Sequence, residues 1–177
     1  MPRATTFTST PVAALKAGKH VLCEKSLACN ANEAREMNQL AKDQGLVLMD
    51  AFHYRYHPLF ARMKNIVASG TLGTISSIDA AFHTPVTDPS DIRMNYHLGG
   101  GVTMDIGCYP LSMSRLLVGF LQGKAFSNPV FMKIEAELNS GGVDLNSSAE
   151  LQFDDHSIAN ITSAVNKKTE SSVTISD

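Results

Sequence analysis

The first fifty residues alternate between helical patterns and short apolar runs. The stretch 12–18 has the pattern of the last turns of a helix that ends at glycine, and 20–23 is an apolar run typical of a buried parallel strand. Residues 30–45 form a second helical pattern with asparagine as its cap, and 46–49 form a second buried strand. This order, with short connections, predicts a parallel α/β sheet.

The pattern changes after residue 50. Residues 51–58 are aromatic and polar without a period, which indicates a crossover between two domains. A helix is predicted from Pro58 to Gly70, and 78–82 alternates as a half-exposed strand does. The stretch 84–95 is predicted to be a ligand-facing loop. The apolar stripe expected on the helix comprises Leu59, Met63, Ile66 and Val67.

The last third of the chain combines one helix with period-two segments. A helix over 100–117 is expected to be broken by Gly107 and Pro110, with a kink near Tyr109. From 130 to 138 apolar and polar residues alternate, and the same alternation returns at 149–153, 159–165 and 173–175. These segments predict a mostly antiparallel sheet, so the fold class is α/β followed by α+β.

Charge and cysteine content exclude several classes of protein. With 15 Lys+Arg against 17 Asp+Glu the formal charge is −2, which gives no electrostatic footprint for nucleic acid or for an acidic membrane. No apolar run approaches the roughly 18 residues that a membrane span requires. Three cysteines without a C-x-x-C pair indicate a reducing compartment, so we expect a soluble, cytoplasmic protein that binds small molecules.

Two distant segments carry the candidate chemistry. The first strand ends in Glu24 and Lys25, and a glycine run at 99–101 opens a helix that carries Asp105 and Tyr109. A tyrosine, with an ordinary pKa of about 10, is a poor proton acceptor unless a cation stabilises its phenolate. Lys25 is the obvious cation, so a lysine and a tyrosine that share a proton transfer predict a dehydrogenase.

These segments resemble the glucose-fructose oxidoreductase and inositol dehydrogenase family, often called Gfo/Idh/MocA. Residues 17–25 are similar to its A-G-K-H-V-x-x-E-K-P segment, and 99–109 to its G-G-G-x-x-x-D-x-G-x-[HY] segment. The stretch 50–58 resembles its E-A-F-x-Y-R-x-H-P crossover. The resemblance extends from about residue 12 to about residue 165. It implies the C-terminal part of a Rossmann domain at 1–52 and an α+β substrate-binding and dimerisation domain with an open sheet at 53–177.

The resemblance also implies an activity and a set of site residues. The activity is hydride transfer between NAD(P) and a CH-OH group of a sugar or diol at the seam of the two domains. Lys25, Tyr109 and Asp105 would be catalytic, and Glu24 and Lys25 would contact the cofactor. Tyr109 would touch the substrate. From their place in the chain, Arg93 in the ligand-facing loop and His97 before the glycine run could touch it too, and a surface role stays open for both. Many relatives have histidine at the position of Tyr109, and the branches with tyrosine favour NADP. Relatives dimerise through the open face of the sheet, so a homodimer is expected.

Two features depart from the family pattern. Ser26 replaces a proline that commonly follows a cis bond in relatives, so either Lys25–Ser26 is cis or a trans bond shifts the ammonium. No G-x-G-x-x-G phosphate-binding loop occurs in the chain. We therefore expect an N-terminally truncated chain, also incomplete at its C-terminus, that has no cofactor affinity by itself.

Purely structural roles stay open for several of these residues. Lys25 could be a solvated charge, Tyr109 a core aromatic, and Asp105 a brace for the broken helix. Cys108 is more readily explained as a small buried hydrophobe than as a nucleophile, and no metal site is expected from the pair His53 and His57. The alternative function is a non-catalytic remnant that acts as a dimerisation or interaction module.

Overall fold

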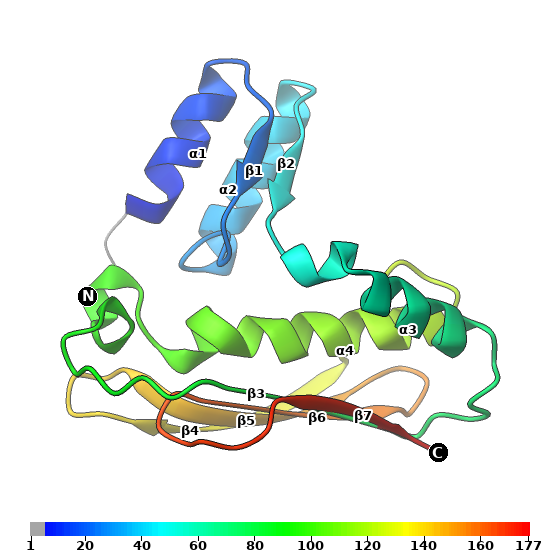
Figure 1. Cartoon of the computed structure of the whole chain (residues 1–177). Helices are drawn as coiled ribbons and strands as arrows, with labels where there is room; N and C mark the ends of the chain where they lie inside the picture. The colour runs from blue at the N-terminus through cyan, green and yellow to red at the C-terminus, as the bar shows by residue number, and fades with distance from the viewer. Residues whose placement is uncertain (1–5) are drawn as a thin grey trace.

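The computed structural model describes residues 6–177, and its N-terminal part is a small two-stranded unit (Figure 1). Helix α1 (Thr6–Lys16) precedes strand β1 (Val21–Cys23), and helix α2 (Ala31–Asp43) precedes strand β2 (Leu48–Asp50). The two strands are parallel, as the pattern predicts. Strand β2 begins two residues later than expected, because the N–H of Leu46 donates to the carbonyl of Ala41 and still belongs to the end of the helix.

A short connection leads from β2 into the second part of the molecule. A 3-10 turn, η1 (His53–Tyr56), precedes α3 (Pro58–Ala68), and the side chain of His57 caps α3 by accepting from the N–H of Leu59. The predicted start at proline is confirmed. The predicted stripe is wrong in part: Phe60 and Val67 are buried, whereas Leu59 and Ile66 are exposed. The ring of Phe60 packs against Tyr54 and Phe120, so α3 directs Phe60 rather than Leu59 into the core.

The glycine-rich segment forms an irregular turn and then a regular helix. Residues Thr103–Gly107 form a π-helical turn, η4, and Cys108–Leu121 form α4. The expected break is therefore present, but it lies in the turn before Tyr109. Pro110 falls in the first turn of α4, where no backbone N–H is needed, so it does not interrupt the helix. The irregularity predicted near Tyr109 thus lies two residues before it, and Gly107 rather than Pro110 marks it.

The C-terminal part is a five-stranded sheet in the order β4-β5-β6-β3-β7. Only the pair β3–β6 is parallel, so the prediction of a mostly antiparallel sheet is confirmed. Helix α4 lies on β3 and β6, and α3 and α4 lie on the same side of the sheet (Figure 1). The strands are β3 (Ser77–His83), β4 (Phe131–Leu138), β5 (Asp144–Gln152), β6 (Ile158–Ala164) and β7 (Ser172–Ser176).

The main core lies between α4 and the sheet. Leu117 and Val118 of α4 are buried against Ile78, Leu151 and Ala159, which come from three adjacent strands. The alternation expected for β3 is confirmed, because Ile78 and Ala80 are buried while Asp79 is exposed. The loop after β3 carries two short 3-10 turns, η2 (Ile92–Met94) and η3 (Tyr96–Leu98). Within residues 6–177, no helix is long and apolar enough to cross a membrane.

Candidate active site

Lys25 and Asp105, eighty residues apart in the chain, form an ion pair. Lys25 lies two residues after the end of β1, and Asp105 lies in the π-helical turn η4. The Lys25 ammonium donates to Asp105 Oδ1 at 2.7 Å and to the Asp105 carbonyl at 2.8 Å. The Lys25–Ser26 peptide bond is cis, and Ser26 Oγ donates to the carbonyl of Met104 at 2.5 Å. The segment after β1 is therefore bonded to η4 by two adjacent residues, Lys25 and Ser26.

A second cation reaches the same carboxylate from the loop after β3. Arg93 Nε donates to Asp105 Oδ2 at 2.7 Å, and Arg93 Nη1 lies 3.2 Å from Asp91 Oδ1. Asp91 also caps η2 by accepting from the N–H of Arg93. The Asp105 carboxylate therefore joins β1, η4 and the loop. Burial works to raise its pKa, but the hydrogen bonds from Lys25 and Arg93 outweigh burial and hold that pKa below its ordinary value.

Tyr109 lies one helical turn after Asp105, in an aromatic environment. Its ring centroid is 5.3 Å from that of Phe52 and 5.3 Å from that of Phe82, with Tyr54 at 5.9 Å. The Lys25 ammonium lies 5.6 Å from the centroid of the Tyr109 ring, within the range of a cation–π contact. Burial raises the pKa of the Tyr109 phenol, while the positive charge of Lys25 works to lower it. The phenol therefore keeps its proton at neutral pH.

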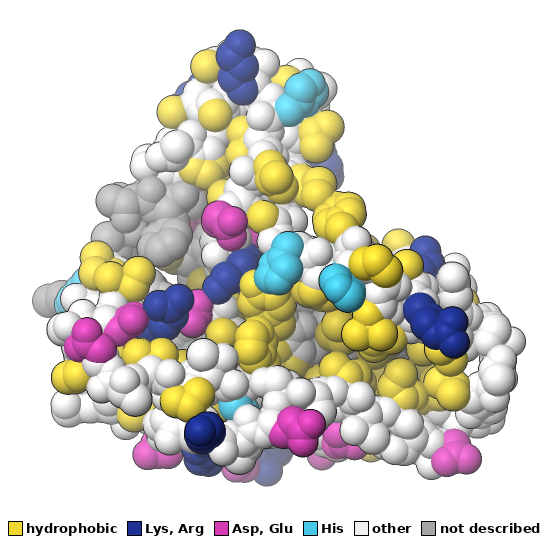
Figure 2. Space-filling view, in the orientation of Figure 1, with side chains coloured by type: hydrophobic (Ala, Val, Ile, Leu, Met, Phe, Trp, Pro, Cys, Tyr) yellow, Lys and Arg dark blue, Asp and Glu magenta, His cyan; other side chains and the backbone are white. Residues whose placement is uncertain are grey.

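Lys25 and Tyr109 line different cavities. Lys25, Arg93 and Asp105 line a cavity of 230 Å³ that is also bordered by Gly99 and Gly100. Tyr109 lines an apolar cavity of 410 Å³ between α3, α4 and the strands β3 and β7. In Figure 2, charged side chains of both signs gather at the junction of the N-terminal unit with the rest of the molecule, beside a hydrophobic surface. Lys25, Arg93 and Asp105 thus border one cavity with charged groups, and Tyr109 borders the other.

The remaining predicted site residues lie farther out. Glu24 is exposed and borders, with Lys25, a cavity of 560 Å³ beside β1. His97 is exposed on η3, and the lining of the polar cavity comes from Ile92 and Leu98 on either side of it in the chain. Of the residues predicted from sequence, the structure thus brings Lys25, Asp105, Arg93 and Tyr109 together, and it leaves His97 aside.

Sequence reasoning missed three features of the site. It missed the aromatic residues Phe52, Tyr54 and Phe82 around Tyr109, although the aromatic run at 52–56 was a signal that could have indicated them. It missed Asp91 as the anchor of Arg93. It also missed Asp50, whose Oδ1 is buried without a hydrogen-bond partner among the described residues. Burial raises the pKa of Asp50, and the neighbouring Glu24 raises it further.

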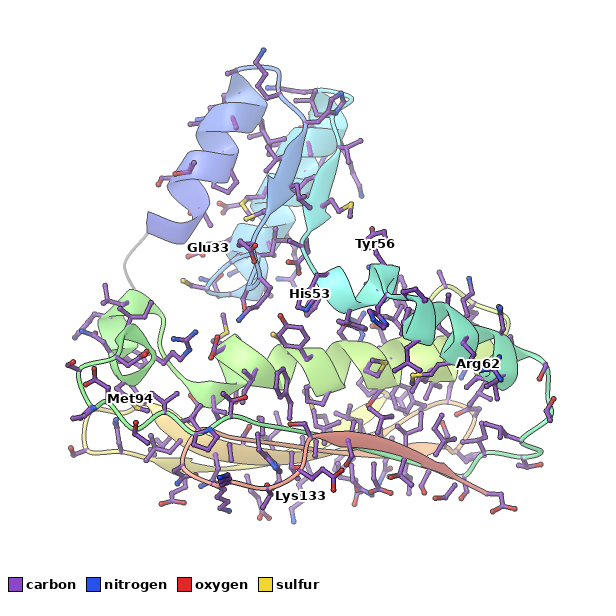
Figure 3. The ribbon with its side chains drawn as sticks, in the orientation of Figure 1. Glu33, His53, Tyr56, Arg62, Met94 and Lys133 are labelled. Atoms are coloured by element: carbon purple, nitrogen blue, oxygen red, sulfur yellow. The ribbon has the colours of Figure 1, made fainter. Side chains whose placement is uncertain are left out.

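The surroundings of His53, His57 and Cys108 are those of residues with structural roles. His57 caps α3, and the ring of His53, labelled in Figure 3 beside the end of β2, lies 6.0 Å from that of Tyr109. No group of three metal-binding side chains occurs among the described residues. Burial raises the pKa of the Cys108 thiol, and its Sγ lies 3.6 Å from the carbonyl of Asp105. A protonated, partly buried thiol fits the small-hydrophobe interpretation.

The described residues provide groups for the nicotinamide end of a dinucleotide and no site for its pyrophosphate. Ligands of parallel α/β sheets bind outside the carboxyl ends of the strands, and Glu24, Lys25 and Asp50 lie at those ends. A pyrophosphate needs free N–H groups at a helix N-terminus, but at α2 the side chain of Asn30 accepts from the N–H groups of Asn32 and Glu33. Within residues 6–177, no glycine-rich turn joins a strand to a helix N-terminus that could replace it.

Comparisons with known proteins identify relatives of matching architecture. Residues 5–52 match the model of the "Oxidoreductase family, NAD-binding Rossmann fold", and residues 60–176 match the "GFO/IDH/MocA C-terminal domain". A D-xylose 1-dehydrogenase (NADP(+)) of Haloferax volcanii is 36% identical over 153 residues, covering 86% of this chain and 45% of the relative. A trans-1,2-dihydrobenzene-1,2-diol dehydrogenase of Xenopus laevis is 38% identical over 96 residues, covering 54% of this chain and 28% of the relative.

Solved structures agree with these matches. An aldose-aldose oxidoreductase from Caulobacter crescentus, complexed with glycerol, superposes with a TM-score of 0.86 at 26% identity, covering 99% of this chain and 52% of that one. A 3-ketoreductase from Actinomadura kijaniata, in complex with NADP and TDP-benzene, gives 0.82 at 26% identity, covering 98% and 52%. The chain spans about half the length of these proteins. The chain belongs to the Gfo/Idh/MocA family of NAD(P)-dependent oxidoreductases.

Proposed function

We propose that this chain carries the proton-transfer half of an NAD(P)-dependent oxidoreductase that acts on a CH-OH group of a sugar or diol. The observation that carries the proposal is the meeting of Lys25 with Asp105 and with the Tyr109 ring, at 2.7 Å and 5.6 Å, across eighty residues of sequence. A cation, a carboxylate and a phenol in one place suit a reaction that moves a hydroxyl proton together with a hydride.

The environment of Tyr109 favours a proton donor. Because burial keeps the phenol protonated, Tyr109 would protonate the carbonyl oxygen during reduction. In the oxidation of an alcohol it would have to lose its proton first, and the positive charge of Lys25 lowers the free energy of the phenolate. Lys25 is itself held by Asp105, so the carboxylate fixes where the positive charge lies. Arg93 would contact polar groups of the substrate in the 230 Å³ cavity.

The cofactor, when bound, supplies or accepts the hydride, and the residues of this chain would hold its nicotinamide end. Glu24 and Lys25 follow β1 at the carboxyl edge of the parallel strands, where the ribose would lie. The name of the Haloferax volcanii relative specifies NADP(+), and by the family resemblance tyrosine at position 109 favours NADP. The occupied N–H groups at the start of α2 give no support for pyrophosphate binding.

The experiment joins the chain to the glycine-rich βαβ unit of a family relative and measures NADP-dependent oxidation of D-xylose, glucose and a trans-dihydrodiol. We expect turnover by the fusion, and no saturable NADPH fluorescence change at micromolar concentration with the 177-residue chain alone. A fusion that binds NADPH tightly but oxidises none of these alcohols would contradict the proposal. Tight NADPH binding by the chain alone would contradict the expected need for a phosphate-binding unit.

A second candidate function is a non-catalytic association module. The observation that favours it is the exposure of all eight residues of β4, together with a sheet face opposite α4 that no helix covers (Figure 1). The sequence-based expectation is a homodimer through this open face. Light scattering of the purified chain measures its mass. A dimer whose fusion form has no turnover would support the module over the enzyme.

A further inference from the structure

Gly101 joins the backbones of two residues on the charged side of the candidate active site. Its N–H donates to the carbonyl of Arg93 at 2.9 Å, and its carbonyl accepts from the N–H of Asp105 at 3.0 Å. The side chains of Arg93 and Asp105 also meet, with Arg93 Nε 2.7 Å from Asp105 Oδ2. Backbone and side-chain bonds therefore close a ring, so the place of Gly101 determines where the Asp105 carboxylate lies.

The carboxylate of Asp144 occupies the space into which a side chain at Gly101 would project. A Cβ at Gly101 would overlap Asp144 Oδ1, and the φ of Gly101 is +126°, in a region that residues with a side chain rarely adopt. The other oxygen, Asp144 Oδ2, accepts from the N–H of Thr103, the first residue of η4, at 2.7 Å. Helix N-termini leave N–H groups without partners inside the helix, and a carboxylate there is stabilising. One side chain thus fixes both Gly101 and the start of η4.

A β-bulge directs Asp144, the first residue of β5, toward η4. Asn146 is opposite Glu137, whereas Asp144 is opposite Leu138, so β5 has one extra residue at this point. Without the extra residue, the alternation of β5 would place Asp144 on the opposite face from Leu151, which packs against α4. The bulge instead puts Asp144 on the helix-covered face, where its carboxylate reaches η4. Bulges that re-aim a side chain are frequent next to active sites.

The turn before β5 holds the backbone of Asp144 in place. Asn139 Oδ1 accepts from the N–H groups of Gly141 and Val143 at 2.8 and 3.0 Å. The N–H of Asn139 donates to the carbonyl of Val143 at 2.8 Å, and the side chain of Val143 is buried. Asp144 directly follows this turn, so its position depends on bonds that do not involve the candidate active site.

We propose that Asp144 is a positioning residue of the candidate active site. It fixes Gly101 and the start of η4, and through them it places the Asp105 carboxylate between its two cations. Asp144 itself lines none of the cavities beside Lys25 and Tyr109, so it acts only through other residues. The catalytic consequence rests on the function proposed above, in which the Asp105 carboxylate determines where the Lys25 charge lies.

Amide hydrogen exchange of the 177-residue chain tests the positioning without a cofactor. Asp144→Ala removes the acceptor of the Thr103 N–H and the group that packs on Gly101. Exchange at Gly101 and Asp105, compared with exchange at Leu117 of α4, should therefore become about tenfold faster or more. Asp144→Asn keeps an acceptor oxygen and the shape of the side chain, so exchange should stay within about threefold of the original.

The fusion with a glycine-rich βαβ unit tests the catalytic consequence. Asp144→Ala should lower kcat about tenfold, because small displacements of positioned groups slow a reaction strongly, and should leave the dissociation constant of NADPH within about threefold. Asp144→Asn should keep at least about half of kcat. Gly101→Ala, whose Cβ overlaps the carboxylate, should lower kcat similarly, and the double variant Gly101→Ala/Asp144→Ala should lose much less than the two separate losses combined.

Ile78→Val is the matched control, because it removes a methyl group from the core beside α4 and leaves Asp144 and Gly101 untouched. It should lower Tm by about 2 to 4 °C and leave kcat within about twofold well below Tm. Circular dichroism checks that each variant is folded.

The outcomes separate this proposal from the proposed function. An original fusion that binds NADPH without turnover would contradict the proposed function, while the exchange measurement would still decide whether Asp144 fixes Gly101 and Asp105. The positioning role is overturned if Asp144→Ala leaves exchange at both amides unchanged. It is also overturned if an active fusion loses no more rate with Asp144→Ala than with Ile78→Val.

Discussion

Asp105 and Tyr109 lie four residues apart, on successive turns of η4 and α4, yet their surroundings are opposite. Asp105 receives hydrogen bonds from two cations, which hold its pKa down. Tyr109 lies among aromatic rings, and burial raises its pKa. One helical segment therefore presents an acid that stays ionised and a phenol that stays protonated. Environments that shift the pKa values of two neighbouring titratable groups in opposite directions are typical of sites in which one group carries charge and the other transfers a proton.

The irregular backbone of η4 separates the two regions. The π-helical turn ends at Gly107, between the acid and the phenol, and Gly107 packs directly against β6. A Cβ at Gly107 would lie 2.9 Å from Ser163 Oγ, so an added side chain requires Ser163 or the backbone of η4 to move. π-helical turns occur frequently at functional sites. Asp105 lies before this contact and bonds to the loop through Arg93, and Tyr109 lies after it among the aromatic rings.

The largest expected effect concerns the aromatic side. In the fusion with a glycine-rich βαβ unit, Tyr109→Phe keeps the ring packing and removes only the hydroxyl. If Tyr109 transfers the proton, kcat should fall by about 10² to 10⁴ while NADPH affinity stays within about threefold. Steady-state kinetics and NADPH fluorescence measure both quantities. A variant that turns over at the original rate would leave Tyr109 with a packing role only.

A smaller effect is expected when the charged side is broken. Asp105→Ala leaves Lys25 partly buried without its anion and frees Arg93, so the free energy of unfolding should fall by about 2 to 3 kcal/mol. Urea unfolding monitored by circular dichroism measures the loss. Asp105→Asn, which keeps the shape and some hydrogen bonds, should lose less. Equal stability of Asp105→Ala and the original chain would show that the ion pair contributes nothing to folding.

The boundary between the two regions gives a third test. Gly107→Ala should destabilise the chain by about 1 to 2 kcal/mol, because the added methyl group overpacks the contact with Ser163. Ser163→Ala removes only the close Oγ, so Gly107→Ala should cost much less in the Ser163→Ala background than in the original chain. Urea unfolding of the original chain, the two single variants and the double variant measures this difference. A cost reduced by less than about a third would place the strain in the backbone of η4 instead.

The dependence of stability on pH tests the lowered pKa of Asp105. The folded pKa of Asp105 is lower than its unfolded value, so the stability that this group contributes is present above about pH 4 and is lost as the pH falls towards the folded pKa. The difference in unfolding free energy between the original chain and Asp105→Asn should therefore shrink as the pH falls below about 4. Urea unfolding at a series of pH values tests this. A difference that stays constant with pH would contradict the depressed pKa.

The charged side of the site could be predicted from sequence better than the aromatic side. Lys25 and Asp105 were predicted from segments that resemble the family's motifs, and Arg93 was a candidate from its place in the ligand-facing loop, but its contact with Asp105 was not predicted. The aromatic cluster depends on Phe82, which comes from β3, and on the angle between η1 and α4. Such packing angles follow from the shapes of side chains across three elements and leave no local pattern.

The same limit explains the partial success with the elements themselves. The strands and helices follow from period and caps, as at Asn30 and Pro58, and the sheet was predicted to be mostly antiparallel. The parallel pairing of β3 with β6 could not be predicted, because it joins segments eighty residues apart. The burial of Phe60 in place of Leu59 depends on contacts with Tyr54 and Phe120, which sequence spacing does not specify.

The smallest expected effect joins the two regions through Lys25. Its ammonium lies 5.6 Å from the Tyr109 ring centroid and works to lower the pKa of the phenol, against the larger effect of burial. Lys25→Met removes the charge and keeps most of the side-chain volume, so the pKa of Tyr109 should rise further above its ordinary value. Ultraviolet titration of the phenolate, with Tyr109→Phe subtracted to isolate this one tyrosine, measures the change. A pKa that falls or stays fixed in Lys25→Met would show that the two regions are electrostatically independent, and the lysine would then have no part in setting when the tyrosine releases its proton.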